Sequence, residues 1–270
     1  MRLSSTLWLT AIFCLLFLFT ACEKEEPIIA AKNQEEFSAA DQQMIGARLT
    51  AQVGQDDHNF PLFKSDNPAV EEELTNYMNS LIRTVAISVP VKNRNNFDWK
   101  VTIIDREEIH LFSAPGGHFF VYTGLLKALD SEAELIGLLG HELKYVDASK
   151  TILSLKNEFG GVAMGDILLG RDVAQIDNMA LWLRDLSYSE DEVLEADQFA
   201  IDVLCPYLYN NHGLSNAITR LSDVSDRTVE WLEKRPGAIK RLEVLENMEM
   251  DCGQNEKYFA ERYMQMVAKL

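Results

Sequence analysis

Apolar positions along the chain change from helical spacing to strand-like spacing and back again. Between 37 and 53, and between 70 and 85, apolar residues recur every three or four positions, which predicts two amphipathic helices. Segment 97–103 alternates apolar and polar residues, as half-buried strands do, and further strands are expected at 109–112 and 118–122. Helical spacing dominates from Leu125 onward. The expected helices there cover about 132–148, 150–158, 173–187, 190–209, 214–222, 238–249 and 256–269.

This order of elements predicts one mostly helical α+β domain from 37 to 270, with a small sheet in its N-terminal part. Gly160, Gly161 and Gly165 are expected to break the middle of the helical part into a small apolar segment. The turn Pro115-Gly116-Gly117 is expected to separate the second and third strands. The sequence contains no internal repeat, so a repeat architecture is not expected.

Residues 1–21 have the pattern of a lipoprotein signal peptide. Arg2 precedes an almost unbroken apolar run from Leu7 to Ala21, which is too short to favour a transmembrane helix. Phe19-Thr20-Ala21-Cys22 resembles a bacterial lipobox, so Cys22 is expected to become the lipidated first residue, followed by an acidic tether over 22–36. A retained N-terminal anchor is the alternative. We therefore expect an exported protein anchored to the bacterial outer membrane, on its periplasmic side or at the cell surface.

Charge and cysteine content narrow the expected partners and the compartment. The 270 residues include 25 Lys plus Arg and 42 Asp plus Glu, a net charge of −17, which argues against a nucleic-acid partner. Removal of the signal peptide discards Cys14, and lipidation uses Cys22. The two cysteines that remain, Cys205 and Cys252, are expected to form a disulfide in an oxidising compartment, with two buried free thiols as the alternative.

The first candidate catalytic and metal-binding residues are His141-Glu142 in the predicted helix 132–148. In the motif H-E-x-x-H, two histidines one helical turn apart bind the same zinc ion, and the glutamate activates the zinc-bound water. A histidine–glutamate pair alone is common by chance. The pair becomes informative through the segment that contains Glu195-Ala196-Asp197, where a second helix is predicted to begin.

With these residues the chain resembles the membrane-associated zinc metallopeptidases of the HtpX, BepA and CAAX prenyl protease type, which are gluzincins. The resemblance runs from about Phe37 to the C-terminus. It includes the strand and turn from Ser113 to Leu125, the sequence Gly140-His141-Glu142, and Arg235-Pro236 with Arg241. It implies a gluzincin fold, a zinc cofactor, a polypeptide substrate, and Glu142 as the general base.

The sequence departs from this family at the metal ligands. The second histidine ligand falls on Tyr145, the glutamate ligand falls on Val193, and the late histidine of the family's His-Pro segment falls on Arg235. His141 is the one ligand that matches. Valine offers no ligand atom, and a neutral phenol with a pKa of about 10 replaces imidazole poorly. We therefore expect that zinc, although it is the family's cofactor, is not bound here, so that Glu142 is idle.

Other residues near the expected metal position have alternative roles. The resemblance makes Asp197 the residue that orients His141, and the two are expected to remain as a buried contact that joins two helices. Lys144 lies on the same helix face as His141 and would oppose zinc unless it points away. A rewired site made of His141, Glu192 and His118 is conceivable.

Two functional hypotheses follow. The first is a pseudopeptidase that binds a polypeptide or an envelope partner without cleaving it, with the edge from Phe112 to Val121 adding the polypeptide as a strand. The second is an active metalloendopeptidase whose metal site has been rewired. A purely structural envelope lipoprotein differs from the first hypothesis only in having no ligand.

Overall fold

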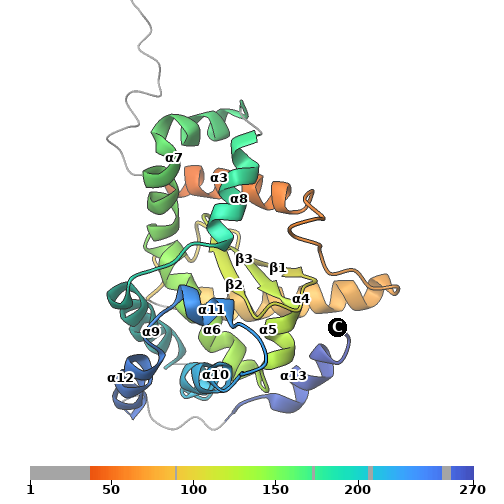
Figure 1. Ribbon diagram of the computed structural model, residues 1–270, viewed down its shortest axis with the longest axis vertical. Coiled ribbons are helices and arrows are strands. Elements are labelled where there is room, and N and C mark those ends of the chain that lie inside the picture. The colour runs from red at the N-terminus through yellow and green to blue at the C-terminus, as the bar shows by residue number, and fades with distance from the viewer. Residues whose placement is uncertain (1–36, 89, 172–173, 206–208, 251–256) are drawn as a thin grey trace, which may run out of the picture. The chain divides into compact units, whose positions relative to one another are not determined.

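The computed structural model describes residues 37–88, 90–171, 174–205, 209–250 and 257–270, and Figure 1 shows their arrangement. The predicted signal peptide, the tether and Cys22 lie outside the described residues. Within the ranges that are described, no helix is both long enough and apolar enough to span a membrane. Cys205 is disulfide-bonded. Its predicted partner, Cys252, lies outside the described residues, so the pairing remains a prediction.

The sheet has three strands in the order β1-β3-β2. The central strand β3 (His118–Tyr122) pairs in parallel with β1 (Lys100–Ile104) and antiparallel with β2 (Leu111–Ala114). This arrangement corrects the expected edge from Phe112 to Val121. Because β3 is paired on both sides, only the β2 part of that range lies at an edge of the sheet, and its four residues are buried.

Side chains alternate between the two faces of the sheet, and both faces are buried. Phe112 and Phe120 point into a core with α3 (Ala39–Val53), α7 (Lys150–Leu169) and α8 (Ala174–Arg184). These three helices are grouped on one side of the sheet in Figure 1. Phe119 and Val121 point into the larger core on the other face. That core is built on helices α4 (Pro68–Ala86), α6 (Glu132–Asp147), α9 (Glu190–Leu204), α10 (Gly213–Ser222) and α12 (Ala238–Met250).

The mostly helical α+β class predicted from the sequence is confirmed, and most elements lie within a few residues of their expected positions. Strand β1 begins at Lys100 rather than at 97, and β2 is shifted by two residues. The expected break at the glycines is wrong in its extent. Gly160 has φ +82°, which kinks α7, but the helix resumes and continues to Leu169. The short helices α5 (Thr123–Ala128) and α11 (Glu230–Lys234) had no separate signal, and α13 (Ala260–Val267) is shorter than expected.

Close packing fixes α6 at the centre of the larger core. Gly137 faces α10, where a Cβ atom in its place would lie 2.6 Å from the backbone nitrogen of Leu214. Gly140, one turn further along, lies against Ala200 of α9. Ser131 caps the first turn of α6, and Ser189 caps α9. The backbone N–H of Ser189 in turn donates to the carboxylate of Glu192. The two helices therefore hold His141 and Asp197 at a fixed separation.

Candidate functional site

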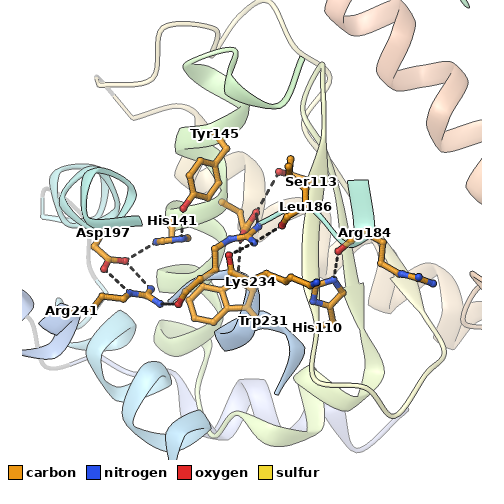
Figure 2. A network of polar contacts seen from close by, with 12 residues as sticks. His110, Ser113, His141, Tyr145, Arg184, Leu186, Asp197, Trp231, Lys234 and Arg241 are labelled. Carbon is orange, nitrogen blue, oxygen red and sulfur yellow. Dashed lines mark hydrogen bonds and ion pairs between the residues drawn. The ribbon is translucent and has the colours of Figure 1, made fainter. Parts of the chain in front are cut away.

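The site residues indicated by the family resemblance gather in one buried network. It lies between α6, α9 and the segment around α11 and α12 (Figure 2). The side chains of His141, Glu142 and Asp197 have no exposed surface. Two arginines, Arg235 and Arg241, are almost as deeply buried beside them. Buried charges are stable only when they are paired and hydrogen-bonded. The contacts of each charged group therefore decide what this site can do.

His141 has a hydrogen-bond partner at each ring nitrogen. Its Nδ1 lies 2.7 Å from Oδ1 of Asp197, so the expected contact between α6 and α9 is present. Its Nε2 lies 3.1 Å from the hydroxyl of Tyr145. Because Asp197 can only accept when ionised, His141 donates through Nδ1, and Nε2 accepts from Tyr145. The nitrogen that would face a metal is therefore occupied by a phenol from the same helix.

Arg241 completes the pairing of Asp197. Its Nε and Nη2 donate to Oδ2 and Oδ1 of Asp197 at 2.8 and 2.9 Å. The remaining donor, Nη1, reaches the backbone carbonyl of Arg235 at 3.0 Å. The guanidinium also lies 4.9 Å from the ring centroid of Trp231. Asp197 thus links α6, α9 and α12 through one carboxylate.

Arg235 makes an equivalent two-point contact with Glu142. Its Nε and Nη2 donate to the two carboxylate oxygens at 2.8 and 2.9 Å. The indole of Trp231 donates to Oε1 at 3.0 Å, and the hydroxyl of Ser113 donates to Oε2 at 3.4 Å. Both oxygens of the expected general base are therefore engaged by three side chains, two from α11 and its C-terminal end and one from β2.

Aromatic packing fills the space around the phenol of Tyr145. Its ring stacks on Tyr188 with centroids 3.6 Å apart and an interplanar angle of 3°. The guanidinium of Arg235 lies over both rings, 4.7 Å from the centroid of Tyr188. Val193 is fully buried in the same cluster. Tyr145 and Val193, the two residues at the expected ligand positions, therefore belong to one apolar and aromatic cluster.

Burial and ion pairing determine which of these groups are charged. Burial lowers the pKa of His141, against the opposing effect of Asp197, so the imidazole is neutral. Burial raises the pKa of Tyr145 well above 10, so its hydroxyl stays protonated. Burial alone would raise the pKa of Asp197, but His141 and Arg241 together lower it. The carboxylate is therefore ionised, in agreement with the direction assigned to each hydrogen bond.

These residues do not fit a catalytic zinc site. Such a site uses three protein ligands and a water molecule. Here Val193 has no ligand atom, and the hydroxyl of Tyr145 donates a hydrogen bond to the nitrogen of His141 that a metal would need. Across the described residues, no group of three or more His, Cys, Asp or Glu side chains is placed to hold a metal ion.

The structure does not bring the rewired set of His141, Glu192 and His118 together. Glu192 caps its own helix through Ser189 and lies 3.4 Å from the ammonium of Lys150. His118 is buried at the start of β3, where burial lowers its pKa to about 4. Lys144 points toward Phe199, with its ammonium 5.3 Å from the ring centroid, and makes no hydrogen bond or ion pair with the described residues of the network.

Sequence reasoning singled out Arg235 and Arg241 within the resemblance but did not predict that they pair with Glu142 and Asp197, and it did not include Trp231 in the site. A signal was present, because Arg235 and Arg241 flank a helix start within a resemblance that already contained Glu142 and Asp197. Two arginines that must be buried need two carboxylates. The pairing of Arg235 with Glu142 rather than Asp197 depends on how α11 lies against β2, which the sequence pattern does not fix.

Comparison with known proteins places these observations in a family. The model of peptidase family M48 matches residues 70–249. The chain is 25% identical over 218 residues to the β-barrel assembly-enhancing protease of Escherichia coli, covering 73% of this chain and 44% of that protein. It is 25% identical over 146 residues to the metalloprotease YcaL of the same organism, covering 50% and 56%.

A mitochondrial relative is also similar. The metalloendopeptidase OMA1 of Arabidopsis thaliana is 25% identical over 150 residues, covering 54% of this chain and 31% of that protein. The chain thus spans between about a third and somewhat over half of the length of these relatives.

The pair of Arg235 and Glu142 predicts a non-additive effect on stability. Arg235→Met leaves Glu142 buried without a cationic partner, so the free energy of unfolding should fall by about 3–5 kcal/mol. Adding Glu142→Met should recover most of that loss, because the double variant buries no charge there. Urea denaturation of the two single variants and the double variant measures the coupling.

The matched control is Lys127→Met, which removes a half-exposed ion pair to Glu107. Its effect should stay within about 0.5 kcal/mol. If Arg235→Met is no more harmful than this control, the buried pair does not hold the structure together.

Proposed function

Because the chain belongs to peptidase family M48, we propose that it is a pseudopeptidase that binds a polypeptide or an envelope partner without hydrolysing it. M48 peptidases depend on zinc. The observation that carries the proposal is the two-point contact between Arg235 and Glu142. A general base must accept a proton from water, and here both carboxylate oxygens already accept hydrogen bonds from a permanently charged guanidinium.

Charge balance supports the same conclusion. Glu142 and Asp197 carry two negative charges. Arg235 and Arg241, which pair with them, carry two positive charges that balance these. A divalent cation added to this network would leave a buried excess of positive charge beside two fixed guanidinium groups. Arg241 is part of the resemblance to the zinc peptidases, whereas Arg235 stands where they have a histidine, so the positive charge added here is that of Arg235. The arginines therefore support a site that is stable without metal.

The edge of β2 is the part of the fold that we propose for polypeptide binding. Tyr122 donates its backbone N–H to the carbonyl of His110, which fixes the alternation along the antiparallel pair. The backbone groups of Leu111 and Ser113 consequently face away from β3. No backbone hydrogen bond to another described residue uses these outward groups. Because Leu111 and Ser113 are buried, an extended polypeptide pairs with them as an additional strand only when the segments that cover this edge move aside.

We propose that this binding function lies at the bacterial outer membrane, where the predicted lipid anchor would hold the chain. The pattern of residues 1–22 carries that part of the proposal. One relative is named for enhancing β-barrel assembly. Together these observations favour a polypeptide partner in the cell envelope, bound from the periplasmic side or the cell surface.

Restoring the family's residues should restore a metal site only when the arginine is also removed. Tyr145→His with Val193→Glu supplies the missing ligands, but Arg235 still neutralises Glu142 and opposes a cation. We expect the triple variant with Arg235→His to bind about one zinc ion per chain, and the double variant to bind far less. Metal analysis of the purified variants measures this difference.

Proteolysis distinguishes the proposal from an active enzyme with a rewired site. The unmodified chain should leave an unfolded protein substrate intact with or without added zinc. Cleavage that a chelator inhibits and Glu142→Gln abolishes would refute the pseudopeptidase and establish the alternative.

In the metal-binding test, a triple variant that folds but gains no zinc would show that the ligand positions are misassigned.

Polypeptide binding should protect specific backbone amides of β2. With an unfolded, reduced protein as the probe, hydrogen exchange at Leu111 and Ser113 should slow, because their amides gain partners. The amides of Phe112 and Phe120 serve as internal controls, since they are already paired within the sheet. Protection that appears elsewhere but not at Leu111 and Ser113 would place the binding surface outside β2.

A further inference from the structure

A second polar site lies on the opposite face of the sheet from the buried network. A cavity of about 290 Å³ is lined by Tyr122 of β3, by residues of the segments that join the elements, by the end of α8 and by α11. His110 and Tyr122, both almost fully buried, project into it from the face that carries Phe112 and Phe120. In Figure 2, His110 with Arg184 lies at one end of the view, and Asp197 with Arg241 lies at the other.

Four buried polar atoms in residues that line this cavity have no hydrogen-bond partner among the described residues. They are Nε of Arg106, Nδ1 of His110, the hydroxyl of Tyr122 and Oε2 of Glu230. Buried polar groups are rarely left unpaired, because each costs the free energy of its lost hydration. Four such atoms in residues around one cavity indicate a ligand that supplies both donors and acceptors.

The character of each atom limits the chemistry of that ligand. Nε2 of His110 lies 2.8 Å from the carbonyl oxygen of Arg184, so Nε2 donates and Nδ1 presents a lone pair. Burial keeps this imidazole neutral by lowering its pKa to about 4. His110 and Glu230 therefore accept hydrogen bonds, Arg106 donates through Nε, and the hydroxyl of Tyr122 can do either.

The charges on the cavity wall point to a ligand that carries both signs. Arg106 is paired with Glu108 at 3.2 Å, and Arg184 is paired with Asp185 at 2.9 Å. Glu230 and Lys234, one turn apart on α11, also line the cavity. The described residues offer neither of these two side chains an ion pair or a hydrogen bond. The charge of Lys234 helps to lower the pKa of Asp185, but Glu230 and Lys234 are left without a direct partner among the described residues.

We propose that this cavity binds a small zwitterion with one ammonium and one carboxylate group, as in a free α-amino acid. The ammonium group pairs with Glu230 and donates to Nδ1 of His110. The carboxylate pairs with Lys234 and accepts from Nε of Arg106. An anion alone would face Glu230 without compensation, and a cation alone would face Lys234. The volume suits one small molecule, and the proposal does not depend on whether the M48 site is catalytic.

Calorimetric titration of the full chain tests the proposal. The probes are L-alanine, L-serine, L-glutamine and L-leucine, each compared with its N-acetyl derivative and its amide, which remove one charge each. At least one amino acid should bind saturably and about tenfold or more tightly than both derivatives. The dipeptide Ala-Ala distinguishes the source, because tighter binding of the dipeptide would overturn the assignment to a free amino acid.

Two variants on α11 connect the binding to the cavity. Glu230→Gln should weaken the amino acid by about tenfold or more, since it removes the charge that faces the ammonium group. Glu233→Gln changes an exposed residue of the same helix and should leave the affinity unchanged. Circular dichroism checks that both variants fold. The proposal is overturned if none of the amino acids binds, if the derivatives bind equally well, or if Glu230→Gln has no effect.

Discussion

The need to neutralise two carboxylates in the centre of the fold is the constraint on which the rest of the structure depends. Glu142 and Asp197 have no exposed surface, and neither can remain ionised there without a partner. Arg235 and Arg241 meet this need with two-point contacts, and Trp231, Ser113 and His141 satisfy the remaining lone pairs. The network joins α6, α9, α12, β2 and the end of α11, so the same contacts that neutralise the charges also fix the packing.

The replacements at the family's ligand positions form one self-consistent set. Tyr145 supplies a hydroxyl to the free nitrogen of His141, Val193 fills the adjoining space, and Arg235 takes the base. Any one of these changes alone would leave an unpaired ligand or an unpaired charge in the core. Together they leave none of the polar atoms of His141, Glu142, Tyr145 or Asp197 among the unsatisfied atoms of the described residues. This consistency favours a site adapted to the absence of metal over one that has merely lost ligands.

The sequence predicts the helices and the fold class well because their signals are local. Hydrophobic spacing predicts α6 almost to the residue, and the resemblance places His141, Glu142 and Asp197 together. Strand order is not local, so the sequence could not show that β3 is the central strand and that only β2 is an edge. The partner of Glu142 was also hidden, because Arg235 lies far away along the chain and reaches it only through the position of α11. The cavity beside His110 and Tyr122 depends in the same way on α8 and α11 meeting the strands.

The metal content of the unmodified protein tests the central claim most directly. The chain should be purified without chelators, equilibrated with zinc, and analysed together with His141→Ala. If the arginine network replaces the metal, bound zinc stays far below one ion per chain and is the same in both proteins. One zinc ion per chain that is lost with His141→Ala would contradict the account, because it would require Tyr145 and Arg235 to leave the positions described here.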